Sequence, residues 1–228
     1  MAFALTPAEW AAATAIIAGG TMLQGSLGFG MALVAAPLLR LVDPVLIPGP
    51  MIIAGLSGPV LILWRERRAV DGGDVVRVLP GALLGIALAG YVVTLVSEAA
   101  LGLLFGALVL LAVGLSIARR PPVPGWRLLF VAGGLSGFMA TTTSIGGPPL
   151  ALAFQDRGGS RLRGTLSACF VPMGCLALTA LYAAGRLGGR ELITGAALLP
   201  AVVAGFWVSH YTAQLLDRHW LRGAVLAL

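Results

Sequence analysis

Long uncharged stretches dominate the chain and predict its secondary structure. Seven runs lack any charged side chain, and an eighth begins near His219: residues 10–39, 44–64, 78–97, 99–118, 128–155, 164–185 and 192–216. About 20 apolar residues in a helix cross a bilayer, and lipid forces such segments to satisfy their backbone hydrogen bonds internally. The alternation expected of a transmembrane barrel is absent. The pattern therefore predicts an all-α, polytopic integral membrane protein.

Two of these runs are too long for one ordinary crossing. Residues 10–39 and 128–155 would each measure about 42–45 Å as a single helix, against a hydrocarbon core of about 30 Å. The first contains the glycine-rich segment 25–30, and the second contains the segment 141–149 with two consecutive prolines. Glycine disfavours continuation of a helix, and proline suits the first turn of a new one. Each long run is predicted to be a helix, an irregular loop and a second helix.

The order of run lengths repeats once along the chain. In each half a long run comes first and runs of ordinary length follow it. At an offset of 118 residues, Ser26 corresponds to Ser144 and Gly28 corresponds to Gly146. Duplicated halves that are interrupted at corresponding places are typical of secondary transporters, and the interruptions point to the binding site.

The later helices of the two halves correspond at an offset of 120 residues, which matches Pro80 to Pro200. The predicted division is a first transmembrane repeat, residues 1–120, and a second, residues 121–228. By the same offset the partner of the run 99–118 should end near residue 238, so 238 − 228 = 10 residues of the last helix are expected to be missing.

The distribution of arginine favours inverted repeats. All 15 basic residues are arginine. If each long run crosses the membrane once, the arginines divide 9 to 6 between the two sides, whereas hairpins that enter and return divide them 12 to 3. Because basic residues concentrate on the cytoplasmic side, the sharper bias favours hairpins with the N-terminus outside. The predicted fold is two homologous inverted repeats, each with one Gly/Pro-broken helical hairpin plus three transmembrane helices.

Composition excludes several other classes of protein. Hydrophobic residues make up 58% of the chain and charged residues 11%, whereas soluble domains are about 45–50% apolar and about 25% charged. The net charge is +6, but apolar runs separate the arginines, so no nucleic acid partner is expected. Cys169 and Cys175 lie six residues apart in one apolar run and do not face each other on a helix. We therefore expect no disulfide, no metal site and no cofactor.

The interrupted segments offer chemistry suited to a small anion. A half-helix that begins inside the membrane has unpaired N–H groups and a partial positive charge at its N-terminus. Glycines allow an oxyanion to approach the backbone, and the hydroxyls of Ser26 and residues 141–144 add donors. Small residues can instead serve only close helix packing. That explanation is favoured for the glycines of uninterrupted helices: Gly81, Gly85, Gly90, Gly102, Gly106 and Gly114.

Acidic residues are nearly missing from the interior of the runs, which favours an anionic substrate. A coupling ion is left open. Backbone and hydroxyl oxygens could hold Na⁺, and His210, one turn from Gln214, could relay H⁺, although a structural or interface role for this histidine is favoured.

The sequence also bears on three other functions. An intramembrane serine protease built on Ser26 and His210 is disfavoured, because Gln24 stands where the Gly-x-Ser-x-Gly motif requires glycine. A structural subunit without transport is disfavoured by two polar interruptions at equivalent positions. A passive anion channel, which needs a continuous wet pore, is not separated from a carrier by the sequence.

Three segments resemble the two half-signatures of the sulfite exporter TauE/SafE family of membrane permeases. They are GSLGFGMALVAAPLL at 25–39, GGLSGFMATTTSIGGPPLALAF at 133–154 and RLRGTLSACF at 161–170. The resemblance implies a bacterial or archaeal inner-membrane protein with about eight helical segments in two repeats, and small sulfur- or carbon-containing anions as substrates. It also implies that residues 26–30 and 141–149 line the permeation site. Met31 departs from the family pattern, which often has a third glycine there.

These observations predict a secondary transporter or exporter of a small anion, with a sulfite-like oxyanion or an organosulfonate as the favoured substrate. The anion is expected near the membrane midplane, between the two broken segments, with the lipid bilayer as the other partner. The predicted substrate-binding residues are Gln24, Ser26, Gly28, Phe29, Gly30, Thr141, Thr142, Thr143, Ser144, Gly146, Gly147 and Pro148.

Overall fold

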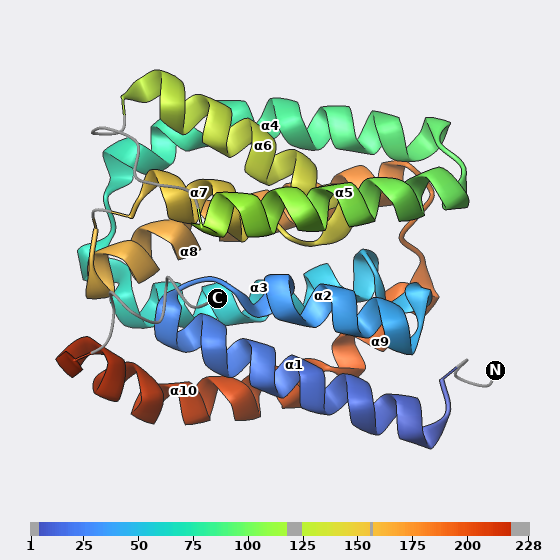
Figure 1. Ribbon diagram of the computed structural model, residues 1–228, viewed down its shortest axis with the longest axis horizontal. Coiled ribbons are helices and arrows are strands. Elements are labelled where there is room, and N and C mark those ends of the chain that lie inside the picture. Colours follow the sequence, from blue (N-terminus) through green and yellow to red (C-terminus); the bar gives the residue numbers. More distant parts are fainter. Residues whose placement is uncertain (1–4, 118–124, 156, 220–228) are drawn as a thin grey trace.

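The computed structural model describes residues 5–117, 125–155 and 157–219, and every regular element in these ranges is a helix (Figure 1). The first half of the chain forms α1 (Pro7–Leu27), α2 (Met31–Val42), the 3-10 turn η1 (Pro44–Leu46), α3 (Gly49–Glu66), the 3-10 turn η2 (Arg67–Ala69), α4 (Gly72–Leu95) and α5 (Glu98–Ile117). The second half forms α6 (Trp126–Thr143), α7 (Gly147–Ala153), α8 (Gly159–Ala183), α9 (Gly189–Ala197) and α10 (Leu199–His219). The prediction of an all-α protein is confirmed.

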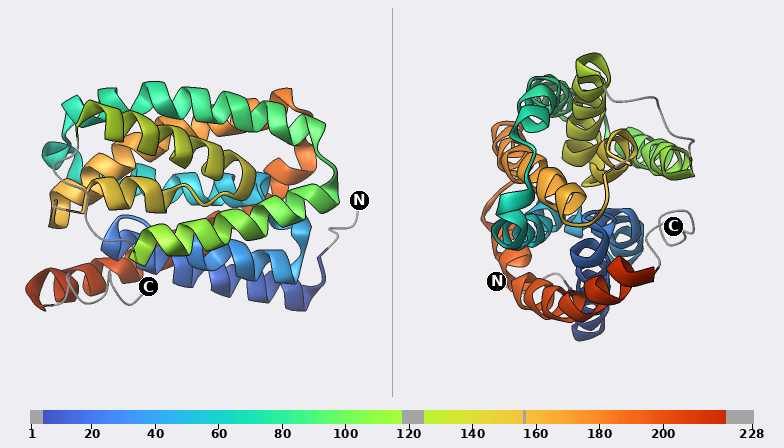
Figure 2. Two further views of the ribbon diagram at one scale, coloured as in Figure 1. Left: turned by 45° about the horizontal axis from the view of Figure 1, so that its top comes forward. Right: turned by 90° about the vertical axis from the view of Figure 1, so that its left-hand side faces the viewer.

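Three helical segments among the described residues are long and apolar enough to cross a membrane: Gly72–Leu95, Gly159–Ala183 and Gly189–Thr212. The helices run roughly along the long axis of the molecule (Figures 1 and 2). Large apolar side chains face outward from them, including Leu84, Leu103 and Trp207, which are 62%, 79% and 76% exposed. Lipid solvates such a surface without the free-energy cost that water imposes. The chain is a multi-pass integral membrane protein.

Helices from the two halves of the chain pair with each other. α4 packs along α6 at one edge of the molecule and α1 packs along α10 at the opposite edge, with α3 against α8 between them (Figures 1 and 2). Each of these pairs joins a helix of residues 1–120 to a helix of residues 121–228. The core is therefore shared between the two halves.

Glycines let the paired helices approach backbone to backbone. A Cβ atom on Gly85 of α4 would run into the backbone carbonyl of Gly134 on α6, and a Cβ on Gly205 of α10 would run into that of Ala18 on α1. Gly81 of α4 is in the same position against α6. Close approach of this kind is how small residues drive association of helices in lipid, where apolar burial gives no advantage.

Both long runs are interrupted where the sequence predicts. The first break separates α1 from α2, and its residues Gly28 and Gly30 have φ angles of 90° and 106°, which glycine adopts without a steric penalty. The second break separates α6 from α7 and contains Ser144 with a φ of 65°, which is uncommon for a residue with a side chain. Pro148 and Pro149 occupy the first turn of α7, as expected.

The run 192–216, predicted as part of one crossing helix, is divided between α9 and α10. Leu198 interrupts the helix, and Pro200 follows in the first turn of α10. Proline has no N–H to donate and its ring clashes with the carbonyl four residues earlier, so the first turn of a new helix accommodates it. The corresponding Pro80 lies inside the continuous α4. The two halves therefore differ at this point.

Ion pairs between the two halves gather at one end of the molecule. Arg163 pairs with Glu66 at 3.2 Å, and Arg157 and Arg161 pair with Asp71 at 3.1 and 2.7 Å. The Arg161 hydrogen bond and the nearby Arg157 hold the pKa of Asp71 below its ordinary value. The turn from α3 to α4 and the start of α8 thus share one face, while residues 118–124 lie outside the described part of the chain.

Candidate functional site

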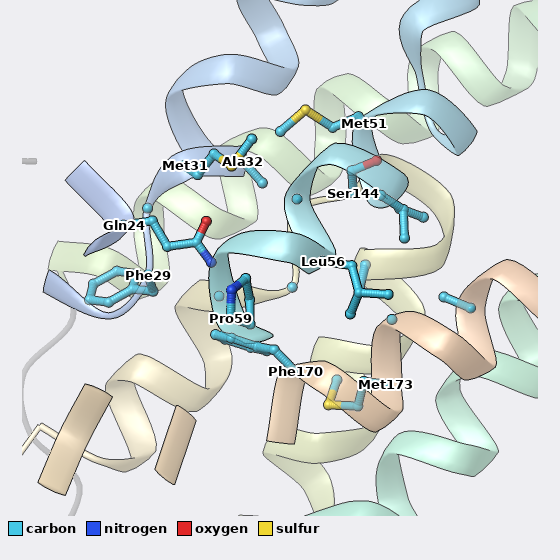
Figure 3. Close-up of a pocket in the computed structure, with 18 residues that line it drawn as sticks. Gln24, Phe29, Met31, Ala32, Met51, Leu56, Pro59, Ser144, Phe170 and Met173 are labelled. Carbon is cyan, nitrogen blue, oxygen red and sulfur yellow. The ribbon is translucent and has the colours of Figure 1, made fainter. Parts of the chain in front are cut away.

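A cavity of about 90 Å³ lies where the two breaks meet (Figure 3). The breaks are in contact, because a Cβ on Gly147 would stand 3.4 Å from the Cβ of Phe29. The cavity is lined by Gln24, Phe29, Gly30, Met31, Ala32, Met51, Ile52, Gly55, Leu56, Pro59, Ala140, Ser144, Gly146, Gly147, Phe170, Met173, Gly174 and Ala177. One water needs about 10–15 Å³ of such space, so there is room for several waters or one small polyatomic ion.

Gln24 supplies a buried carboxamide to this cavity. The residue is 7% exposed, and no hydrogen bond to its side chain is found within the described residues. Its Oε1 lies over Gly58 of α3, where a Cβ would be 3.6 Å away, and Figure 3 shows the carboxamide directed from α1 toward Pro59 and the cavity interior. A carboxamide offers two donors and one acceptor. The amide atoms are not among the fully buried, unpartnered polar atoms of the described residues, so they reach the space of the cavity, where a ligand or water can bond to them.

The N-terminus of α2 borders the same space. The N-cap residue is Gly30, which has no side chain that could accept a hydrogen bond from the first turn. Gly30, Met31 and Ala32 all line the cavity. The first N–H groups of a helix have no partner within it, and they carry the positive end of the helix dipole. This end of α2 can therefore stabilise negative charge in the cavity.

The second break contributes less than the sequence argument assumes. α7 is only seven residues long, and Pro148 and Pro149 in its first turn have no N–H groups. The carbonyl of Gly146 accepts a hydrogen bond from Ser136 of α6. The start of α7 therefore offers fewer backbone donors than the sequence suggests, with the N–H of Gly147 remaining. Among the backbone donors, α2 carries most of this chemistry.

Ser144 is the second polar side chain on the cavity wall. Its Oγ donates to the carbonyl oxygen of Pro48 at 3.2 Å. The left-handed backbone of Ser144 turns the chain between α6 and α7, and the Oγ1 of Thr143 accepts a hydrogen bond from the N–H of Ile145 at 3.3 Å in the same turn. The described residues place no charged side chain on the cavity wall. The polar side chains that face the space are neutral.

The structure brings six of the twelve predicted site residues to the cavity and leaves the others outside its wall. Those on the wall are Gln24, Phe29, Gly30, Ser144, Gly146 and Gly147. Ser26 turns toward α10, where its Oγ lies 2.6 Å from the Oγ1 of Thr212, and it also donates to the carbonyl of Met22. Gly28 packs against Arg163, and Pro148 is buried in the first turn of α7.

The three consecutive threonines direct their hydroxyls into their own helix. Thr141, Thr142 and Thr143 donate to carbonyls four residues earlier in α6 at 2.9, 2.8 and 2.7 Å. Such bonds satisfy a buried hydroxyl locally and remove it as a ligand donor. These threonines satisfy their hydroxyls within α6, and none of the three lines the cavity.

Sequence reasoning missed the apolar part of the wall. Met31, Met51 and Met173, together with Phe170 and Pro59, close the cavity from α2, α3 and α8 (Figure 3). These residues sit in apolar helical runs where nothing distinguishes them from core residues. Methionine is flexible and polarisable, so this wall can adapt to a small organic group.

Arg163 is a second residue that sequence reasoning missed. It lies 4% exposed at the start of α8, pairs with Glu66, and packs its backbone and Cγ 3.0 Å from where a Cβ of Gly28 would be. A buried arginine beside the first break is a signal that the sequence does contain, since it stands in the segment 161–170. Its charge is neutralised by Glu66, so Arg163 supports the break and does not face the cavity.

Two other candidates lie away from the cavity. His210 is an exposed residue of α10 whose ring packs edge-on to Tyr211 at 6.0 Å, so a buried structural role is wrong for it; the side chain of Gln214 lies outside the described residues. Within the described ranges, no group of three or more His, Cys, Asp or Glu side chains could hold a metal ion.

A polytopic helical protein with two broken segments meeting at a buried, neutral donor site belongs to the class of membrane transport proteins. The chain matches the sulfite exporter TauE/SafE family over residues 11–228, nearly its whole length, and it belongs to that family. Membership implies a membrane exporter of sulfite-type anions rather than an enzyme, with a small anionic substrate and a lipid environment. No curated protein and no solved structure matches the chain.

Proposed function

We propose that the protein is a secondary carrier of a small oxyanion, a sulfite-like ion or a small organosulfonate, bound in the cavity between the two breaks. The observation that carries the proposal is the carboxamide of Gln24, which has no hydrogen-bond partner among the described residues, beside the uncapped N-terminus of α2. Both groups donate hydrogen bonds, and the helix end adds a partial positive charge.

The cavity suits an oxyanion better than a cation. Two kinds of donor converge on it, the backbone N–H groups of α2 and the Gln24 amide; the Ser144 hydroxyl lies on the wall and donates to Pro48. Neutral donors in a water-poor site bind an anion without trapping it permanently, because no full positive charge has to be left behind on release. The methionine and phenylalanine walls accept the apolar part of an organosulfonate.

Inverted repeats and alternating access form the finer part of the proposal. The repeat relates α1 to α6 and α4 to α10. A pseudo-twofold axis between the halves would therefore carry the pair α4–α6 onto the pair α10–α1, and the presence of both pairs supports such an axis. The ion pairs of Glu66 and Asp71 with the start of α8 tie the halves together at one end. We take this end as the cytoplasmic one, in a bacterial or archaeal inner membrane, because arginine concentrates there. Coupling to H⁺ or Na⁺ is compatible with this arrangement.

The test is flux of radiolabelled sulfite and of a labelled organosulfonate into liposomes that contain the purified protein. Gln24→Glu replaces the carboxamide with an isosteric carboxylate and should abolish flux at neutral pH, since the negative charge repels the substrate. Gln24→Met keeps the length but removes the donors and should weaken apparent affinity about 2- to 10-fold, the value of one neutral hydrogen bond. Normal flux in Gln24→Glu would overturn the site.

A passive anion channel is the alternative, and the same liposomes separate it from a carrier. Unlabelled anion on the opposite side should accelerate uptake of label through a carrier, because the loaded site returns faster than the empty one. A channel gives no such acceleration and passes a steady current under an applied voltage.

A further inference from the structure

A second cavity, of about 560 Å³, lies on the other side of the second break. Its wall includes Arg40 near the end of α2, Arg186 in the turn after α8 and Glu191 in the first turn of α9. The two arginines come from different halves of the chain. They belong to the three arginines that the hairpin arrangement assigns to the arginine-poor side.

The described side chains on this wall carry more positive than negative charge, with Arg40 and Arg186 against Glu191. Among the described residues, neither Arg40 nor Arg186 forms an ion pair. The Arg40 guanidinium lies 5.1 Å from the centre of the Phe105 ring, and Arg186 donates to the carbonyl of Val93 at 3.4 Å. Glu191 accepts the N–H of Gly188 at 2.8 Å and thereby caps α9. The wall thus holds two guanidinium groups and one carboxylate, and that carboxylate already accepts a hydrogen bond from Gly188.

The larger cavity adjoins the smaller one through a thin wall. Thr142 and Pro48 line the larger cavity, and Ser144 lines the smaller one. The hydrogen bond from the Ser144 hydroxyl to the Pro48 carbonyl, at 3.2 Å, crosses this wall. In α3, Pro50 faces the larger cavity and the next residue, Met51, faces the smaller.

We propose that the larger cavity is an anion-collecting vestibule, a second and weaker site for small oxyanions, held by Arg40 and Arg186. The inference rests on the proposed function for the identity of the anion but not for its charge. A cleft in which one sign of charge predominates raises the local concentration of counter-ions and their rate of arrival. A guanidinium also matches an oxyanion with two parallel N–H donors.

The first experiment measures charge in the vestibule without any transport. A reactive thiol is placed on the vestibule wall by the substitution Val45→Cys. The exposed Cys175 is removed by Cys175→Ala, and Cys169 is left in place because it is buried. The protein is held in nanodiscs of uncharged lipid. The rate of labelling is then measured for two methanethiosulfonate reagents, one bearing a sulfonate group and the other an ammonium group. The ratio of the sulfonate rate to the ammonium rate should be at least about ten times the ratio measured for a free thiol.

The matched variants identify the source of that preference. Arg40→Gln with Arg186→Gln should bring the rate ratio close to that of a free thiol, while Arg40→Lys with Arg186→Lys should keep most of it. Methanesulfonate, an unreactive small oxyanion, should slow labelling by the sulfonate reagent only when the arginines are present. A ratio that the double Gln variant leaves unchanged overturns the vestibule.

A lipid phosphate could supply the same chemistry as a free oxyanion. Phosphatidylglycerol is therefore added to the nanodiscs in a separate arm. If this lipid blocks labelling and methanesulfonate does not, the occupant is a lipid headgroup and the proposed vestibule for a soluble anion is overturned. Blocking by methanesulfonate in uncharged lipid supports it.

Flux measurements separate this inference from the proposed function. In liposomes, the double Gln variant should raise the KM for anion supplied on the vestibule side about tenfold with kcat little changed, and should leave the KM from the other side unaltered. If the parent protein carries no anion but labelling still depends on the arginines, the proposed function fails and the vestibule stands. Normal flux with an unaltered KM in the Gln variant overturns the vestibule alone.

Discussion

Gly147 lies directly against Phe29, with 3.4 Å between the Cβ of Phe29 and the position of a Cβ on Gly147. The two residues are 147 − 29 = 118 positions apart, which is the offset that matches Gly28 to Gly146 in the sequence repeat. Residues at corresponding places in two halves can touch only if they lie close to an axis relating those halves. The contact supports our placement of the binding site at the centre of an inverted repeat.

Gly55 offers a direct test of the charge that the cavity accepts. It lines the cavity from α3, and a Cβ there would meet nothing within 4 Å. Gly55→Asp should abolish oxyanion flux, because a carboxylate about 4 Å from a bound anion costs about 4 kcal/mol at an effective dielectric of 20, roughly a thousandfold in affinity. Gly55→Asn has nearly the same shape and should retain much of the flux. Equal flux in the two variants, measured in liposomes, would place the anion elsewhere.

Ser144 should tolerate glycine but not a β-branched residue. Its φ of 65° places a side chain in the left-handed region, which costs about 1–2 kcal/mol for an ordinary residue. Ser144→Gly removes that strain together with the hydrogen bond to Pro48, so its thermal stability should stay close to that of the parent protein. Ser144→Val should be about 1–2 kcal/mol less stable than Ser144→Gly. Identical unfolding curves in detergent would show that the second break is relaxed.

The pair of Arg163 with Glu66 should show strong coupling in a double-mutant cycle. Both side chains are largely buried, at 5% and 12% exposed, so Glu66→Gln removes a carboxylate that pairs with the buried guanidinium. We expect each single variant to lose about 3 kcal/mol or more of unfolding free energy. The double variant, Glu66→Gln with Arg163→Gln, should lose clearly less than the sum. Strict additivity in denaturant titrations would mean that the pair is not formed.

Gly85 and Gly106 form a matched pair for helix packing. Gly85→Ala places a methyl against the carbonyl of Gly134, so α4 and α6 must separate, at a cost of about 1–3 kcal/mol. Gly106→Ala on α5 meets nothing within 4 Å and should be neutral or up to about 1 kcal/mol stabilising, since alanine favours the helix. Comparing thermal unfolding of the two variants checks both. Equal effects would contradict the close pairing of α4 with α6.

The features predicted from the sequence are those that depend on local backbone chemistry. Glycines at 28 and 30 and prolines at 148 and 149 dictate where a helix stops and where a new one starts, whatever surrounds them. The break positions followed from this, and the membrane class followed from the length and apolarity of the uncharged runs. The division of the run 192–216 did not, because Pro80 and Pro200 are alike in sequence and only their tertiary surroundings decide whether the helix continues.

The cavity wall was harder to predict because it depends on which way side chains turn. Thr141 and Ser26 look like anion ligands in the sequence, but their hydroxyls find carbonyl acceptors four residues earlier. Met51 and Met173 look like core residues, yet they face the cavity. The sequence alone does not say which way a side chain on a helix faces, because that depends on the helices packed around it. Met51 and Met173 line the same cavity although 173 − 51 = 122 positions separate them in the chain.

The ion pairs at the start of α8 also constrain how the protein is built during synthesis. Glu66 and Asp71 precede their arginine partners by 86 to 97 residues. At a translation rate of about 5–20 residues per second, the carboxylates wait about 5–20 s for those partners. During that time Glu66 can pair with the adjacent Arg65 and water solvates Asp71, so the turn from α3 to α4 must stay at the membrane surface. The nascent chain locks into its final arrangement only after the first turns of α8 have left the ribosome.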